Sequence, residues 1–152
     1  MAVNYAHLAF VHRLVTNCYS CGHHSGARKV LEELGGTNYL QEAISTTPDN
    51  DELYKGYLAN LSFVWWRLTG ETQARDWAKV IWEQAAKGEH WVHPTHMLAY
   101  LALMDDATPQ SEVRALIERL RLVRQHTRDV ERATRLAELA ERLAQKLWGC
   151  QQ

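Results

Sequence analysis

The residues best suited to chemistry are the cysteines and histidines between positions 18 and 24. Two residues separate Cys18 from Cys21, and His23 and His24 follow after Gly22. Thiolates and imidazoles at this spacing can supply tetrahedral ligands for Zn²⁺ from one loop. The segment is therefore a candidate zinc site. The competing interpretation is a helix end followed by a polar turn, with Cys18 packed inside as a small hydrophobic residue.

A second histidine series occurs at His90, His93 and His96. On one continuous helix, a spacing of three would spread these imidazoles over about 120°, which a facial metal site tolerates. Pro94 is well placed as the first residue of a new helix, which leaves His90 and His93 in the preceding loop. The zinc hypothesis combines the 18–24 segment with this series. The alternative is that these histidines interact with backbone groups at a helix start.

Large aromatic rings are the other notable feature, because the chain has six Trp and six Tyr but two Phe. Such rings recur in cores and at binding surfaces. Helical phase places Trp65 and Trp77 on core faces, whereas Trp66 and Trp82 fall toward the edges of those faces. A Trp-rich core is the competing interpretation. The residues predicted to contact a partner are Tyr57, Trp66, Arg67, Arg75, Trp82 and Trp91.

These side chains are organised around the stretch from 51 to 87. Apolar residues recur there at three- and four-residue steps on both sides of Gly70, as in two amphipathic helices. The three residues from Thr69 to Glu71 leave room only for a sharp reversal, so the sequence predicts a central helical hairpin.

Helical periodicity extends over the rest of the chain, and no segment alternates like a strand. We therefore expect an all-α fold of about seven helices in antiparallel hairpins, forming a single domain over 1–152. Glycine and proline are absent between Pro109 and Trp148, yet the apolar positions change phase midway. We predict a break at 125–129, with Thr127 or Asp129 as the helix cap. The helix that follows, at about 129–148, would be a capping or dimerising helix; self-association would use Leu136, Leu139, Leu143 and Leu147.

The central hairpin resembles part of the tetratricopeptide (TPR-like) helical repeat. A large apolar residue followed by a small one stands at Leu61 and Ser62, an aromatic residue at Trp65, and the small residue of the second helix at Ala74. A looser version in the first hairpin involves Leu14, Cys18, Ala27 and Leu31. The two matches lie farther apart than the repeat length of about 34 residues. The resemblance implies a stacked array with a protein- or peptide-binding groove, and an irregular helical bundle fits the same periodicity.

Charge and composition narrow the function classes. The formal net charge of the whole chain is −1, which is too mild to indicate a nucleic-acid-binding protein. Arginines recur every seven residues from Arg114 to Arg142, but a break at 125–129 divides this series, and glutamates interleave it as on a solvated face. No apolar run reaches the length of about 18 residues that spans a bilayer. Three cysteines, an odd number, favour a reducing compartment, so we expect a cytoplasmic protein without a membrane partner.

The chain has no phosphate-cradling glycine loop, no HExxH motif and no nucleophile elbow, so we expect it not to be an enzyme. The first hypothesis is a non-enzymatic protein–protein interaction module, such as an adaptor, chaperone-like or inhibitory protein. Its partner would be a protein or peptide, and no cofactor is needed. The alternative is a zinc-binding helical protein.

Overall fold

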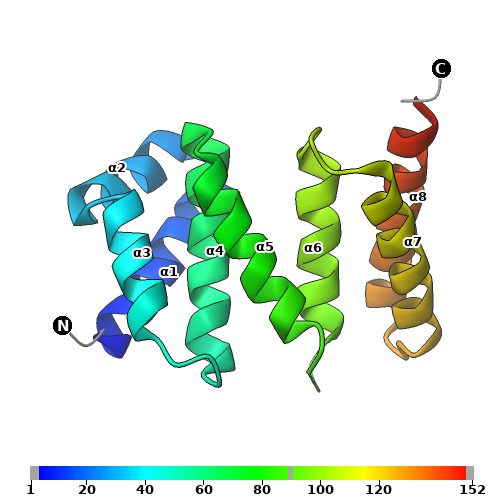
Figure 1. Ribbon diagram of the computed structural model, residues 1–152, viewed down its shortest axis with the longest axis horizontal. Coiled ribbons are helices and arrows are strands. Elements are labelled where there is room, and N and C mark those ends of the chain that lie inside the picture. The colour runs from blue at the N-terminus through cyan, green and yellow to red at the C-terminus, as the bar shows by residue number, and fades with distance from the viewer. Residues whose placement is uncertain (1–3, 89–90, 150–152) are drawn as a thin grey trace. The chain divides into compact units, whose positions relative to one another are not determined.

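The computed structural model describes residues 4–88 and 91–149, and within these ranges it contains eight helices and no strand (Figure 1). This confirms the all-α class, with one helix more than the approximate number predicted. The chain divides into two compact units, 1–81 and 82–152. Whether they act as one domain stays a prediction, and each unit is described by itself.

The first unit contains α1 (Tyr5–Ser20), α2 (His24–Leu34), α3 (Thr37–Thr46) and α4 (Glu52–Thr69). α5 (Thr72–Ala85) begins in this unit and continues into the second. α4 packs against α1, α2 and α3, and most of its residues from Leu58 to Trp65 are buried. The side chain of Asp51 caps α4 by accepting a hydrogen bond from the amide of Tyr54, at 3.3 Å. Both α4 and α5 lie within the 51–87 stretch on which the sequence analysis centred.

The short connection between α1 and α2 is a turn at Gly22. At the end of α1, the amide of His23 donates to the carbonyl of Cys18 at 2.8 Å, and that of Gly22 donates to Tyr19 at 3.1 Å. Gly22 has a φ of 84°, so the turn is a Schellman motif that satisfies the last carbonyls of the helix. Because the chain reverses at Gly22, α2 begins at His24, with His23 as its N-cap residue.

Gly36 is held against an indole. It begins the turn into α3 with a φ of 58°, and a Cβ built on it would lie 2.8 Å from Cζ2 of Trp65. The Trp65 indole nitrogen also donates to Oγ1 of Thr37 at 3.0 Å and to Oε2 of Glu71 at 3.1 Å, while Thr37 donates to Glu71. This arrangement ties α3, α4 and the start of α5 together, and only a glycine fits at position 36 without displacing the ring.

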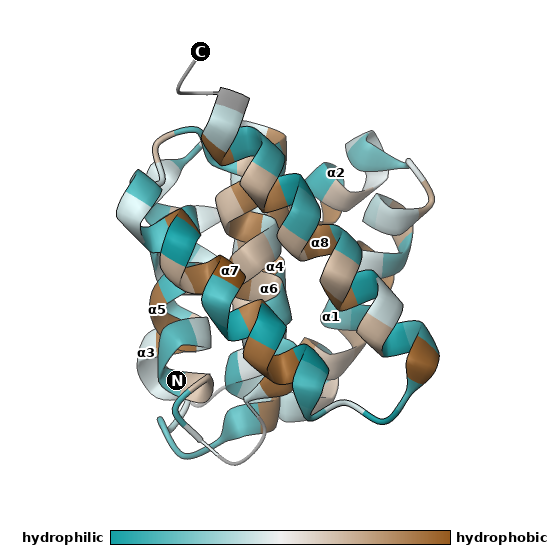
Figure 2. Ribbon diagram, turned by 90° about the vertical axis from the view of Figure 1, so that its right-hand side faces the viewer, coloured by the Kyte–Doolittle hydropathy of each residue, from teal (hydrophilic) through white to brown (hydrophobic). Residues whose placement is uncertain are grey.

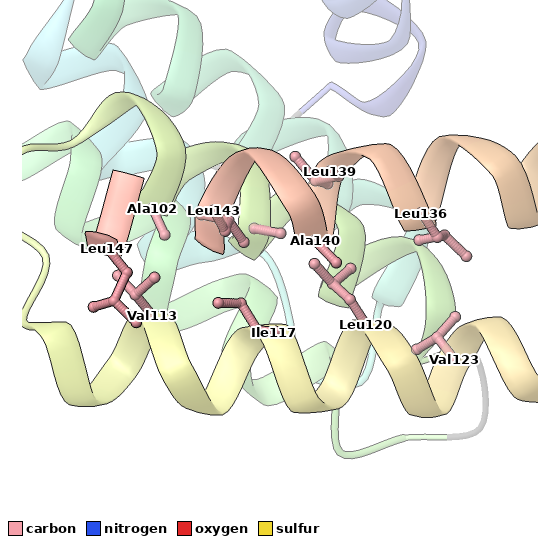
Figure 3. Close-up of a cluster of buried hydrophobic side chains, with 11 residues drawn as sticks. Ala102, Val113, Ile117, Leu120, Val123, Leu136, Leu139, Ala140, Leu143 and Leu147 are labelled. Carbon is pink, nitrogen blue, oxygen red and sulfur yellow. The ribbon is translucent and has the colours of Figure 1, made fainter. Parts of the chain in front are cut away.

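The second unit contains α6 (Val92–Met104), α7 (Gln110–Gln125) and α8 (Val130–Gly149). Hydrophobic and hydrophilic positions alternate around α7 and α8 (Figure 2). The apolar stripes of these two helices point toward each other (Figure 3) and pack with α6 residues. The core of the unit consists of Ala99, Ala102, Val113, Ile117, Leu120, Val123, Leu136, Leu139, Ala140, Leu143 and Leu147.

The predicted break between α7 and α8 is confirmed. α7 ends at Gln125 and α8 begins at Val130. Oδ1 of Asp129 accepts hydrogen bonds from the amides of Glu131, at 3.0 Å, and Arg132, at 3.2 Å, as an N-cap does. At the other end of α8, the ammonium of Lys146 donates to the carbonyls of Ala102, Leu103 and Asp105 in and after the last turn of α6. The C-terminal ends of α6 and α8 are therefore neighbours, and these two helices run parallel.

The predicted self-association surface is wrong. The side chains of Leu136 and Leu143 are fully buried, and Leu139 and Leu147 are 3 % and 8 % exposed. They form the inner stripe of α8 and pack within this chain. They are therefore not available to a second copy.

The start of α6 also differs from the prediction, because the helix begins two residues before Pro94. Proline fits throughout the first helical turn, since the amides there have no acceptor within the helix. His93 consequently belongs to α6 rather than to a loop. Within the described ranges, the chain contains no helix with the length and apolar character needed to cross a membrane.

Candidate functional site

Four rings form a row across α1 and α4 of the first unit. Tyr5 stacks on Tyr54 with ring centroids 4.3 Å apart, and Tyr54 meets the edge of Tyr57 at 5.7 Å. Tyr57 in turn stacks on His12 at 4.1 Å. We call these residues the aromatic row. Because Tyr5 pairs with the first turn of α4 and His12 with its second, α1 and α4 lie side by side and parallel.

The row ends in a polar pair. The side-chain nitrogen of Asn60 lies 3.1 Å from Nε2 of His12. The Asn60 amide therefore donates to Nε2 when the neutral His12 ring carries its proton on Nδ1. Burial lowers the pKa of His12, which favours this neutral form. Oδ1 of Asn60 is buried without a hydrogen-bond partner in the described part of the chain. Turning the amide over would let Oδ1 accept from a proton on Nε2 but would leave the nitrogen without an acceptor.

This surface is exposed to solvent at Tyr5 and at Leu53. Tyr5 is 38 % exposed and Leu53, one helical turn before Tyr57, is 58 % exposed. Tyr54, Tyr57 and His12 are half-buried. The rings thus combine a fixed arrangement with accessible apolar area, the combination found at the anchor points of protein interfaces.

Among the predicted partner-contacting residues, Tyr57 belongs to the aromatic row. Trp66 is half-buried, with Phe63 at its edge, and the guanidinium carbon of the exposed residue Arg67 lies 5.6 Å from the Trp66 ring centroid. Arg75 lies on α5 and pairs with the carboxylate of Asp76 at 3.1 Å.

The two remaining predicted contacts lie in the second unit. Trp82 is 2 % exposed, so its assignment to a helix edge is wrong. The buried residues of α5 follow a strict four-residue step through Ala74, Ala78 and Trp82, and this stripe drifts around the helix by about 40° at each step. Trp91 is partly buried and packs on the core of the second unit.

Among the described residues, the structure does not gather the candidate zinc ligands into a metal-binding group. Cys18 is half-buried in the last turn of α1, and Cys21, His23 and His24 are exposed around the Schellman turn. The ring of His24 stacks on Tyr19, with centroids 4.8 Å apart. Nowhere in the described ranges do three or more His, Cys, Asp or Glu side chains gather closely enough to hold a metal ion. The local geometry is that of a helix end and a turn.

His93 and His96 lie one helical turn apart in α6, and His90 lies outside the described residues. The His96 ring stacks on Tyr100, with centroids 5.0 Å apart. Although His93 is exposed, surrounding protein atoms desolvate its ring and lower its pKa, and Arg132 lowers it further. The pKa of His96 is lowered by burial first and then by His93, Arg135 and Arg132. These two histidines therefore lie among positive charges.

Sequence reasoning missed Tyr5, His12 and Leu53. A signal for the first two was present, because Tyr5 and His12 are seven residues apart and lie on one flank of the apolar stripe through Leu8 and Val15. The match to the rings of α4 required the pairing of α1 with α4, which periodicity along each helix does not specify. Compared with known proteins, the chain gave no match to a family model, to a curated protein or to a solved structure.

Proposed function

We propose that this chain is a non-enzymatic protein-binding module that recognises a partner through the surface of the aromatic row and Leu53. The observation that carries the proposal is the continuous series of ring contacts from Tyr5 to His12, open to solvent at Tyr5. A protein or peptide segment with apolar side chains would cover the exposed ring faces. No cofactor takes part.

The packing of the rings supports this role. Interfaces draw most of their affinity from a few aromatic anchors that are already fixed before binding, because little side-chain entropy is then lost. Tyr54 and Tyr57 are each held by two ring neighbours, so their orientation is set within the unit. Tyrosine also offers a hydroxyl at the rim, where a partner's backbone can meet it.

The neighbouring helices support the same proposal. Parallel packing of α1 and α4 is what stacked helical hairpins require of the first helix in each pair. The TPR-like part of the proposal rests on this pairing together with the small buried residues Ser62 and Ala74. The free thiols of Cys18 and Cys21 fit the reducing, cytoplasmic location that we propose for the protein.

The test compares two exposed-residue variants as affinity baits. In the first, Tyr5→Ser and Leu53→Ser remove the exposed apolar side chains of the proposed surface. In the matched control, Val80→Ser and Leu122→Ser remove apolar side chains of α5 and α7 that are 64 % and 49 % exposed. Circular dichroism checks that both variants keep their helix content.

Proteins recovered by the unaltered chain and by the control, but not by the first variant, are the expected result. Direct titration with such a partner should then show at least about a tenfold loss of affinity for the first variant, since truncating an interface anchor costs more than about 1.4 kcal/mol. Equal recovery by all three baits, or equal loss in both variants, would show that the aromatic row is not the binding surface.

A further inference from the structure

A positively charged surface lies on α6 and α8 of the second unit. His93, His96 and Tyr100 follow one another at helical spacing on one flank of α6. Arg132 and Arg135 occupy the first two turns of α8 and are exposed. We call these five residues the basic surface. It is independent of the aromatic row, which belongs to the other unit.

α6 and α8 contact each other and run parallel, with their C-terminal ends together. Lys146 fixes the relative position of the helices by binding carbonyls at the end of α6. Counting back along both helices at about 1.5 Å per residue brings Arg135 to the level of the first turns of α6. The effect of Arg132 and Arg135 on the pKa of His96 agrees with this proximity.

The positive charges on this surface have no carboxylate partner in the chain as far as it is described. Neither Arg132 nor Arg135 forms an ion pair or a side-chain hydrogen bond with a described residue. The nearest element, α7, contributes another guanidinium, since Arg119 donates to Oγ1 of Thr95 at 3.3 Å. In contrast, Arg28 and Arg121 each have a glutamate of their own helix as a partner.

We propose that the basic surface binds a phosphate group. Two guanidiniums can each present a pair of N–H donors to phosphate oxygens, and the imidazoles of His93 and His96 and the hydroxyl of Tyr100 can add further donors. A bound dianion would remove the repulsion among these groups. It would also lie near the first turn of α6, whose amides have no side-chain cap and carry partial positive charge.

The surroundings favour a compact phosphate over an extended nucleic-acid backbone. Glu131 and Glu138 are exposed on α8 beside Arg132 and Arg135. They would repel a chain of phosphates that continued along the helix. A single phosphate, free in a small molecule or attached to a peptide, needs only the two guanidiniums and does not extend along the helix.

The experiment measures binding of inorganic phosphate by two-dimensional NMR, in a phosphate-free buffer at constant pH and ionic strength. The test variant carries Arg132→Gln and Arg135→Gln. The control carries Arg114→Gln and Arg121→Gln, which remove the same charge from exposed positions of α7. Circular dichroism confirms the helix content of both variants.

In the unaltered chain and in the control, phosphate should shift the ring resonances of His93, His96 and Tyr100 and saturate, whereas sodium chloride should not. The test variant should bind at least about tenfold more weakly, because it loses the charge-assisted hydrogen bonds of both guanidiniums. The same affinity in the test variant and the unaltered chain, or an equal effect of phosphate and chloride, would overturn the proposal.

Three further ligands identify the source of the phosphate. A phosphoserine peptide that binds more tightly than both phosphate and its unphosphorylated form would indicate a protein partner. A nucleoside monophosphate that binds more tightly than phosphate would indicate a small molecule. Duplex DNA that binds more tightly than both, and weakens equally in the test and control variants, would mean a diffuse polyanion surface and would overturn the proposal.

Discussion

The two units differ in the contacts that stabilise each of them internally. The core of the second unit is an aliphatic layer between α7 and α8, with two alanines of α6 packed against it. The first unit has buried aliphatic residues too, but it adds contacts that depend on particular atoms: an indole on Gly36, a hydrogen-bonded group at Thr37 and Glu71, and the aromatic row.

This difference bears on where binding surfaces can arise. An aliphatic stripe buried between two helices leaves only their polar flanks for a ligand, so the second unit offers charges, as on the basic surface. Rings are large enough to contribute to packing and still remain partly exposed. The first unit can therefore use the same side chains for packing and for recognition.

The largest expected effect is in the aliphatic core. Leu143→Ala should lower the free energy of unfolding of the second unit by roughly 3–5 kcal/mol, because it removes a fully buried side chain and leaves a cavity. Hydrogen exchange followed by mass spectrometry measures the effect segment by segment. Leu122→Ala, on the exposed side of α7, is the control and should change little. Similar losses in the two variants would contradict the core assignment.

In the first unit the corresponding test is at Gly36. Gly36→Ala should destabilise by about 2–4 kcal/mol, because the left-handed backbone disfavours a Cβ and the added methyl collides with Trp65. Gly56→Ala should have the opposite sign, with a gain of about 0.5–1 kcal/mol, since a Cβ in that part of α4 meets nothing within 4 Å. Urea denaturation followed by tryptophan fluorescence measures both. A neutral Gly36→Ala variant would show that the indole does not depend on the glycine.

The contrast between the units also explains what the sequence could predict. In the second unit, apolar periodicity and its change of phase were enough to place α7, α8 and the break at Asp129. Whether Leu136 and Leu143 are buried within one chain or between two copies was not predictable, because the same apolar stripe can pack in either way. In the first unit, the limit between α4 and α5 followed from Gly70, whereas the aromatic row depends on which helices pair. The basic surface was missed because Pro94 was expected to begin the helix, which placed His93 in the preceding loop.

A smaller effect is expected at the cap of α8. Asp129→Ala should cost about 0.5–2 kcal/mol, because the amides of Glu131 and Arg132 lose their acceptor. Asp129→Asn should retain most of the stability, since the amide oxygen can accept the same hydrogen bonds. Exchange rates in the first turn of α8 are the measurement. If the Asp129→Ala and Asp129→Asn variants show the same exchange rates, the capping interaction does not stabilise the start of α8.

The smallest expected effect is the dependence of stability on pH, which can be compared between the two units. His12 in the first unit and His93 and His96 in the second all have a folded-state pKa below the usual value of 6.5. The unfolded chain therefore binds more protons than the folded chain as the pH falls below about 6.5, so stability should decline there and level off below the folded pKa values.

Burial alone acts on the pKa of His12, whereas nearby arginines also lower the pKa values of His93 and His96. Added salt should accordingly weaken the decline in the second unit and leave that in the first nearly unchanged. Hydrogen exchange at several pH values and two salt concentrations resolves the units, and His12→Gln should reduce the decline in the first unit alone. An equal response of both units to salt would show that arginine charge does not distinguish them.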